Sequence, residues 1–298
     1  MNKNSKNTKI KTIVTHSGRF HADDVFAVAA LKILLKNYRL KVVRTREPEI
    51  ISEGDFVVDV GTVYNASQNK FDHHQLKGAG KRKNGIPYAA FGLVWKKYGE
   101  KISGKKRVAQ EIDEKIVQFI DAEDNGVKTS KPIYTFEPFT ISDLVSVWYP
   151  AWNEKTSEDE AFKSACAVAE KILNRAITRV EARIVAEKFV STAYRRAKDK
   201  RIVVLPQKYP WQDFLINFPE PKFVISPQGQ VWHVTAVKKD NLTFENRLSF
   251  PKVWGGKRDK ELARVSGVED AIFCHNNLFM AVTGSKESAI KLAEIALQ

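Results

Sequence analysis

Short apolar strands alternate with helical segments along the first 120 residues, and this alternation constrains the fold more than any other feature. The expected elements are strands at 10–15, 41–45, 55–60 and 70–72 and helices at 25–36, 89–98 and 111–120. A helix between two strands returns the chain across the sheet, so the strands pair in parallel. We therefore expect an N-terminal α/β domain built on a parallel sheet.

The rest of the chain has a different pattern. Residues 158–199 contain neither Pro nor Gly and are rich in Ala, Glu, Lys and Arg, which predicts one long helix or two consecutive helices. Beyond it, 223–237 predicts a hairpin with a Pro-Gln-Gly turn, 271–282 a second strand pair and 285–297 a closing amphipathic helix. We expect three parts: an N-terminal domain (1–150), a helical connector (151–200) and a smaller α/β C-terminal domain (201–298).

The chain is strongly basic. Its 49 Lys and Arg residues outnumber 35 Asp and Glu residues, giving a net charge of +14. Such an excess favours polyanionic partners, either nucleic acid or phosphorylated small molecules. General solubility is the alternative interpretation of the same charge.

The composition also bears on location. No apolar run approaches the roughly 20 residues that span a bilayer, so we expect no membrane association. The Lys- and Asn-rich start, 1–11, lacks an apolar core and predicts a short disordered tail rather than a signal peptide. Cys166 and Cys274 stand far apart in apolar surroundings, as buried free thiols do. Together these features predict a cytoplasmic protein.

Ligand-type side chains gather where the expected N-terminal strands end. Four of the six histidines lie between positions 16 and 74. The set comprises His16, His21, Asp23, Asp59, Asp72, His73 and His74. Carboxyl ends of parallel strands meet at one rim of a sheet, so these groups converge there.

This mixture of groups predicts a metal site. Imidazole nitrogen together with carboxylate oxygen suits Mn²⁺, Zn²⁺ or Fe²⁺. At least five such side chains exceed the ligands of one closed zinc site and indicate two metals, the arrangement that serves phosphoryl displacement. The alternative is that each His and Asp form an ordinary hydrogen-bonded pair.

The motifs resemble a known family. Asp72-His73-His74 is similar to the signature of the DHH phosphoesterases. More closely, 15–24, 58–61 and 71–75 resemble the Myg exonuclease family, the melanocyte-proliferating-gene product and its microbial relatives. Residues 121–126 are similar to that family's fourth motif. The resemblance covers nearly the whole chain and implies a DHH-type catalytic N-terminal domain followed by a substrate-binding C-terminal domain.

The resemblance also implies residue roles. His16, His21 and Asp59 would hold the first metal. A bridging Asp59 would hold the second metal with three further ligands, Asp23, His73 and Asp121. The spacing leaves Asp124 as a rival to Asp121.

Four further residues are expected to act on the substrate or on the histidines. His74 would contact the scissile phosphate, and Asp72 would orient the histidine pair. In the C-terminal domain, Arg247 could bind a phosphate bidentately, and His275 occupies a family position at a turn. One departure is that 279–284 lacks the family's Gly-Gly-His element, which bears on how this domain holds substrate.

The expected function is metal-dependent phosphodiester hydrolysis by a 3′–5′ exonuclease acting on RNA, with two divalent ions, Mn²⁺ first and Zn²⁺ or Fe²⁺ as alternatives. Two other functions stay open. One is a small-molecule phosphohydrolase acting on pyrophosphate or nucleotides. The other is a non-enzymatic nucleic-acid binder with structural metals. The sequence leaves open the metal, the polarity, RNA against DNA, and the oligomeric state.

Overall fold

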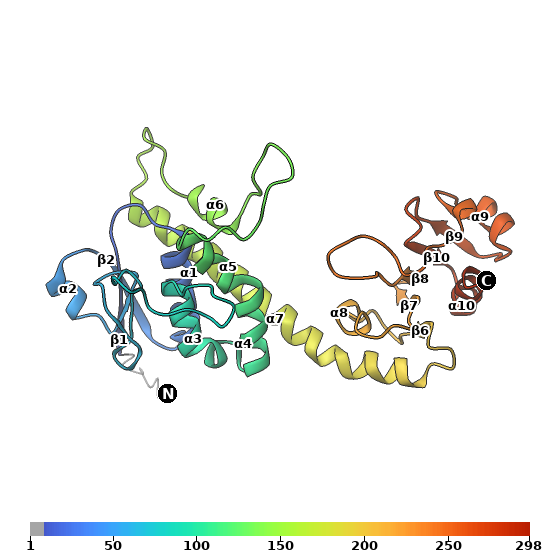
Figure 1. Cartoon of the computed structure of the whole chain (residues 1–298), viewed down its shortest axis with the longest axis horizontal. Helices are drawn as coiled ribbons and strands as arrows, with labels where there is room; N and C mark the ends of the chain where they lie inside the picture. The colour runs from blue at the N-terminus through green and yellow to red at the C-terminus, as the bar shows by residue number, and fades with distance from the viewer. Residues whose placement is uncertain (1–8) are drawn as a thin grey trace, which may run out of the picture. The chain divides into compact units, whose positions relative to one another are not determined.

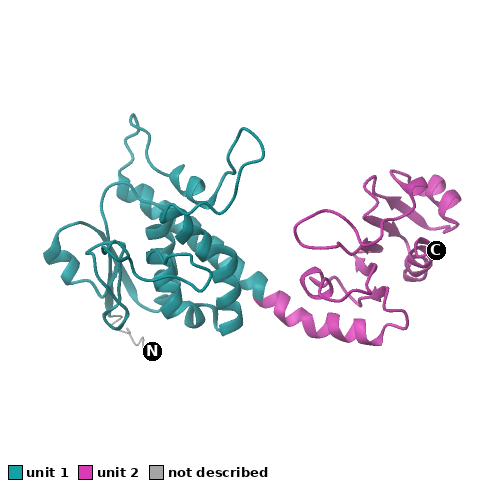
Figure 2. Ribbon diagram, in the orientation of Figure 1, with its two compact units in different colours: residues 1–180 teal, residues 181–298 magenta. Residues whose placement is uncertain are grey.

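The computed structural model describes residues 9–298, so most of the expected tail at 1–11 lies outside the described residues. The chain divides into two compact units, Met1–Val180 and Glu181–Gln298 (Figure 2). The division falls inside the helix α7 (Glu158–Arg196), which is one continuous helix. The three-part division at residues 150 and 200 stays a prediction.

The first unit is built on a five-stranded sheet in the order β2-β1-β3-β5-β4. Figure 1 labels β1 and β2 of this sheet. Four of these strands pair in parallel: β1 (Ile10–Thr15), β2 (Arg39–Arg44), β3 (Phe56–Val58) and β5 (Lys70–Phe71). The edge strand β4 (Tyr64–Asn65) is antiparallel to β5. The parallel α/β sheet expected from the sequence is confirmed, and only the two-residue β4, too short to show a pattern, was not foreseen.

Helix α1 (Ala22–Leu34) is apolar nearly all round because it is covered on nearly all sides. Every side chain from Val25 to Leu31 is fully buried. Helix α3 (Ala90–Ser103) contacts α1 along its length, and Phe26 of α1 meets Phe91 of α3 with ring centroids 5.6 Å apart. A helix that is apolar nearly all round is typical of burial, and α1 is buried.

The remaining short helices of this unit lie on either side of α3 in the chain. Pro48–Ser52 forms the short α2 before β3. The helix expected at 111–120 begins earlier, as α4 (Lys106–Ile112), passes through a π-helical turn and continues as α5 (Gln118–Asp124). Helix α6 (Ile141–Ser146) lies between α5 and α7, and its Thr140 side chain caps its start by accepting a hydrogen bond from the Asp143 amide.

The second unit carries its own five-stranded sheet, in the order β6-β7-β8-β10-β9. The expected hairpin is β7 (Phe223–Gln228) with β8 (Val231–Ala236), and the expected strand pair is β9 (Ala271–Cys274) with β10 (Met280–Thr283). The remaining strand, β6 (Ile202–Val204), runs parallel to β7. The helices are α8 (Gln212–Leu215), α9 (Asp259–Ser266) and α10 (Lys286–Ala296).

A separate apolar core holds this second unit together. Phe223, Phe250 and Trp254 stack in sequence, with ring centroids 4.8 and 5.8 Å apart. They pack beneath α10, which buries Ala289, Leu292 and Ala293 against the sheet. Within residues 9–298, no helix combines the length and the apolarity that a bilayer crossing requires.

The burial of α1 makes a direct stability prediction. Leu31→Ala should destabilise the chain by about 2–5 kcal/mol, because the side chain is fully buried and the cavity left behind cannot close. Leu76→Ala, in the same unit, is the matched control because Leu76 is fully exposed. Urea unfolding should shift for Leu31→Ala alone, and equal midpoints for the two variants would contradict the packing of α1.

Candidate metal centre

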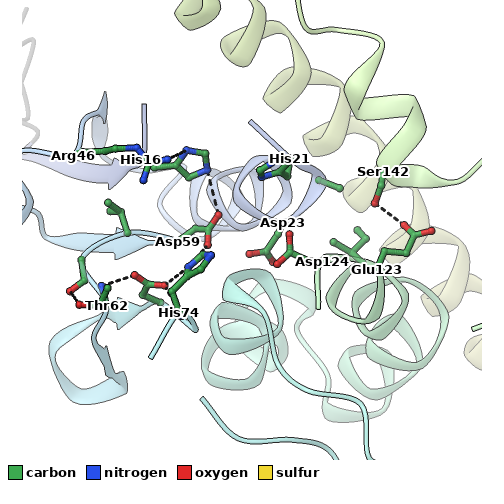
Figure 3. Close-up of a pocket in the computed structure, with 15 residues that line it drawn as sticks. His16, His21, Asp23, Arg46, Asp59, Thr62, His74, Glu123, Asp124 and Ser142 are labelled. Carbon is green, nitrogen blue, oxygen red and sulfur yellow. Dashed lines mark hydrogen bonds and ion pairs between the residues drawn. The ribbon is translucent and has the colours of Figure 1, made fainter. Parts of the chain in front are cut away.

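Parallel pairing brings the carboxyl ends of β1, β3 and β5 to one edge of the first sheet, and the chain places polar residues directly after each. His16 follows β1, Asp59 follows β3, and Asp72 with His73 follows β5. Of these four residues, His16, Asp59 and Asp72 line a pocket of about 600 Å³ (Figure 3). The convergence expected from strand ends is therefore present in the structure.

Asp59 occupies the centre of this arrangement. Its backbone has a φ of 56°, in the left-handed region that aspartate tolerates better than most residues. Its amide still donates to the carbonyl of Phe71 on β5, at 3.1 Å, so the turn is held by the sheet. The left-handed residue ends β3 and directs the carboxylate among the surrounding histidines.

The two carboxylate oxygens of Asp59 contact different histidines. Oδ2 lies 3.3 Å from Nε2 of His16, and Oδ1 lies 3.4 Å from Nε2 of His73. Nε2 of His16 also lies 3.3 Å from Oδ2 of Asp24, and Nε2 of His73 lies 3.1 Å from Oδ2 of Asp124. A carboxylate placed in this way can contribute one oxygen to each of two neighbouring cations.

Three overlapping groups of side chains have the spacing of metal ligands. Within each group the donor atoms lie within 4.8 Å of one another. The groups are His16 with His21 and Asp59; Asp59 with His73 and His74; and Asp23 with His73 and Asp124. Asp59 is shared by the first two groups and His73 by the last two, so the groups form one continuous cluster.

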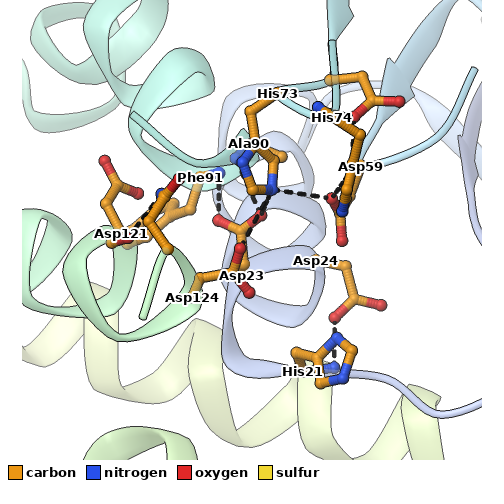
Figure 4. Close-up of polar contacts among 12 residues, drawn as sticks. His21, Asp23, Asp24, Asp59, His73, His74, Ala90, Phe91, Asp121 and Asp124 are labelled. Atoms are coloured by element: carbon orange, nitrogen blue, oxygen red, sulfur yellow. Dashed lines mark hydrogen bonds and ion pairs between the residues drawn. The ribbon is translucent and has the colours of Figure 1, made fainter. Parts of the chain in front are cut away.

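Asp23 is oriented by the first turn of α3. The amide of Ala90 donates to its Oδ2 at 2.8 Å, and the amide of Phe91 donates to its Oδ1 at 2.7 Å (Figure 4). These amides are among the free N–H groups that every helix start leaves without intrahelical partners. Helix α3 therefore fixes the carboxylate of a residue 67 positions earlier in the chain.

The structure separates the two candidate aspartates of α5. Asp121 is fully buried, and its oxygens accept hydrogen bonds from the Gly92 amide at 2.9 Å and from Arg82 at 2.6 Å. It belongs to none of the three ligand groups. Asp124, one turn later, reaches His73 instead. Asp121 was assigned as a ligand from motif resemblance, but in the structure it holds Arg82 and the start of α3 while Asp124 faces the cluster.

Gly92 shows how closely Asp121 packs on α3. A Cβ at this position would lie 1.8 Å from Oδ2 of Asp121. Such an approach leaves no room for a side chain. Glycine in the first turn of α3 therefore permits the carboxylate of Asp121 to reach the helix backbone.

His74 and Asp72 form a pair at the mouth of the pocket. Oδ1 of Asp72 lies 2.8 Å from Nδ1 of His74 and also accepts from the His74 amide at 3.0 Å. Oδ2 of Asp72 accepts from the Thr62 amide at 2.6 Å. The His74 side chain is 58% exposed, in contrast to 7% for His73. Asp72 thus holds a histidine that remains accessible from the pocket.

Burial and ion pairing shift the pKa values of the central residues in opposite directions. Burial would raise the pKa of Asp59, but its contacts with His16 and His73 lower it to about 2. Burial would lower the pKa of His73, but its contacts with Asp124 and Asp59 raise it to about 11. Burial raises the pKa of Asp23 well above its ordinary value, and the carboxylates of Asp59 and Asp124 raise it further.

The cluster of His and Asp side chains contains buried polar atoms that make ion-pair contacts but no hydrogen bond within residues 9–298. Oδ1 of Asp59, Oδ2 of Asp24 and Nε2 of His73 are buried and make no hydrogen bond of good geometry in the described chain. A buried polar group without a hydrogen bond costs roughly 1–3 kcal/mol, and more when it is charged. Cations placed between these atoms would relieve that cost, so the residues present fit divalent metal ions.

Several residues around the pocket were not foreseen. Arg46, two residues after the end of β2, lines the pocket and brings Nη2 within 3.4 Å of Nδ1 of His16. Glu123 and Ser142 form the opposite side, with the Ser142 hydroxyl donating to Glu123 at 2.5 Å. The strand-end rule that found the histidines also applies to Arg46, because it leaves the same edge of the sheet. Ser142 carried no sequence signal because its position depends on the packing of α6.

The candidate residues of the second unit have different surroundings. The guanidinium of Arg247 donates to the backbone carbonyls of Ile216 at 2.6 Å, Phe218 and Pro221. These contacts hold the loop after α8. They use the guanidinium N–H groups of Arg247 that were expected to bind a phosphate. His275 instead lines a pocket of this unit, with its ring centroid 4.4 Å from that of Phe279.

The fold and this centre define an α/β protein with an Asp- and His-lined metal pocket at the carboxyl edge of a parallel sheet. The family model MYG1_exonuc, described as Uncharacterised protein family (UPF0160), matches residues 12–297. The chain therefore belongs to this family, and the resemblance of its motifs is confirmed.

Relatives agree over nearly the full length. The MYG1 exonuclease of Mus musculus is 31% identical, with 96% of this chain and 84% of that protein covered. The MYG1 protein of Dictyostelium discoideum is 30% identical, with 95% of both chains covered. Among solved structures, RecJ of Thermus thermophilus in complex with Mn²⁺ is similar at 13% identity and a TM-score of 0.29, over 96% of this chain and 52% of RecJ.

The raised pKa of His73 predicts that metal binding releases protons. Near pH 7 the metal-free imidazole is protonated, since its pKa is about 11. A ligand must be neutral, so a cation that binds His73 displaces this proton. The apparent affinity should rise about tenfold per pH unit between pH 7 and pH 8.5, or more if other groups also lose protons.

Titration calorimetry with Mn²⁺ in two buffers of different ionisation enthalpy measures this release. For each ion that binds His73, the two observed heats should differ by at least the difference between the ionisation enthalpies of the two buffers. His233→Gln is the control, because His233 on β8 of the second unit belongs to none of the three donor groups and should leave the release intact. Identical heats in the two buffers would show that no proton leaves the site.

Proposed function

We propose that this chain is a 3′–5′ exonuclease that hydrolyses RNA with two divalent ions, preferably Mn²⁺. The observation that carries the two-metal proposal is Asp59, whose two oxygens contact His16 and His73 on opposite sides. The phosphoesterase class is supported by membership in a family in which the relatives from Mus musculus and Homo sapiens are named exonucleases.

The proposed ligands follow the three groups of donor atoms. His16, His21 and Asp59 would hold the first ion. Asp23, Asp59, His73 and Asp124 would hold the second, with Asp124 replacing Asp121 in the set. When bound, such a pair of ions supplies Lewis-acid stabilisation to the attacking and leaving oxygens of a phosphoryl displacement.

The other residues of the pocket would act on the phosphate. His74 is oriented by Asp72 and exposed to the pocket, so it can donate a hydrogen bond to a phosphate oxygen as charge develops. Arg46 adds a cation beside His16 in a pocket whose lining includes the carboxylates of Asp23, Asp59 and Asp124. The first amides of α3 orient the carboxylate of Asp23, and this orientation would place the carboxylate to bind the second ion.

The choice of RNA rests on the family resemblance and on charge. A net charge of +14 suits a polymeric phosphodiester better than a small compact one. The proposed cytoplasmic location is supported by Cys166 and Cys274, both buried and free. A pocket with an exposed, oriented histidine favours catalysis over a purely structural metal.

The substrate assay uses RNA and DNA oligonucleotides labelled at either end, beside pyrophosphate and a nucleoside monophosphate, with Mn²⁺, Zn²⁺ or anaerobic Fe²⁺. We expect 3′-labelled RNA to lose its label first, as a mononucleotide, while 5′-labelled RNA shortens progressively. Faster hydrolysis of pyrophosphate or mononucleotide would assign the chain to small-molecule phosphohydrolases. Binding of RNA without hydrolysis in any metal would leave a nucleic-acid binder.

The adjacent histidines should differ in effect when they are replaced. His73→Ala removes a buried ligand shared by two donor groups and should lose metal as well as activity. His74→Ala should retain metal and lower turnover by roughly 10²- to 10³-fold, as for loss of a donor that acts on developing charge. Elemental analysis and single-turnover rates measure the two effects. Loss of metal from His74→Ala but not from His73→Ala would reverse the two roles.

A further inference from the structure

The segment between α5 and α7, residues 125–157, exposes an unusual number of aromatic side chains. We call five of these side chains the aromatic segment residues: Tyr134, Phe136, Phe139, Trp148 and Trp152. Their exposed fractions are 72%, 71%, 72%, 41% and 96%. Large aromatic side chains normally bury most of their surface. Three of the five precede α6 (Ile141–Ser146) and two follow it, and exposed apolar side chains gathered in one segment often mark a binding site.

This segment is continuous with the metal pocket. It begins directly after Asp124 on α5 and contains α6, which contacts both α1 and α5. Ser142 of α6 lines the pocket and donates to Glu123 of α5, which anchors the segment at the pocket rim (Figure 3). A ligand that fills the pocket therefore contacts this segment at Ser142.

The composition of the segment favours contact with planar aromatic groups over contact with charged groups. Residues 127–157 contain three lysines and three acidic residues, so they carry no net charge. The rings of Tyr134 and Phe136 lie nearly parallel, 6° apart in plane with centroids separated by 5.8 Å. Pro132 and Pro138 flank this pair and restrict its backbone. Aromatic faces bind unpaired bases of any sequence, because every base has a π-face.

We propose that the aromatic segment residues form a stacking surface for the unpaired bases of a single-stranded nucleic acid whose end occupies the metal pocket. This inference rests on the proposed function, since it takes the substrate to be a polynucleotide. It further proposes that part of the affinity for the strand comes from base stacking on the first unit. Such stacking would be independent of base sequence, as an exonuclease that proceeds along a strand requires.

The test compares ring removal with preserved apolar bulk. The triple variant Tyr134→Leu, Phe136→Leu and Trp152→Leu keeps large apolar side chains but removes three π-faces. The matched control is Ile133→Leu with Val147→Leu, which alters two exposed aliphatic residues of the same segment. Both are made in the full chain, and binding is measured with chelator so that no hydrolysis occurs. The probes are a 12-nucleotide oligouridylate and an abasic strand of the same length and charge.

We expect the triple variant to lose affinity for oligouridylate by roughly 5- to 150-fold for each base that was stacked. Its affinity for the abasic strand should equal that of the unaltered chain. The salt dependence should be unchanged, because no charge has been removed. The control variant should bind both probes as the unaltered chain does.

Three results would overturn the proposal. The triple variant could bind oligouridylate as tightly as the unaltered chain. It could lose affinity for both probes equally, which would show that the rings do not act on the bases. It could change the mass of the particle in sedimentation, which assigns the aromatic surface to a second copy of this chain. Because binding is measured without turnover, base-dependent binding by a chain that hydrolyses nothing would refute only the proposed function.

Discussion

The placement of the Asp59 carboxylate between His16 and His73 is the constraint on which the centre depends. Asp59 is held in a left-handed conformation at the end of β3, and its amide is bound to the neighbouring strand β5. The strands on either side deliver the two histidines. A parallel sheet with this strand order brings β1, β3 and β5 side by side, so one carboxylate contacts ligands from both neighbours.

The helices complete what the strand ends begin. Helix α1 starts with Asp23 and Asp24, both fully buried. Asp24 caps α1 by accepting from the His21 amide at 2.8 Å, whereas Asp23 is bound by the first amides of α3. Beyond them, Arg82 joins Asp113 and Asp121. Burial raises the pKa of Asp121 to about 7 although Arg82 opposes this shift. The cost of removing two charges from water offsets much of the attraction within a buried ion pair. We therefore assign this pair to the positioning of α3 rather than to added stability.

The first unit therefore contains two layers of polar contacts with different roles. The inner layer, around Asp59, leaves buried atoms without hydrogen-bond partners and can accept cations. The outer layer, around Asp121 and Arg82, is satisfied by its own hydrogen bonds. In the second unit Arg247 is satisfied in the same way by backbone carbonyls. Residue type alone does not distinguish the two layers, because both are built from aspartates with basic partners.

The sequence by itself determined the strand and helix alternation, the long α7 and the histidines at strand ends, because periodicity and strand-end position are local properties. It did not separate Asp121 from Asp124, since both lie on α5 and only the packing of α3 through Gly92 decides which faces the cluster. Nor did it locate Ser142 or the carbonyl contacts of Arg247. Those depend on segments far apart in the chain meeting in space, which the tertiary structure alone decides.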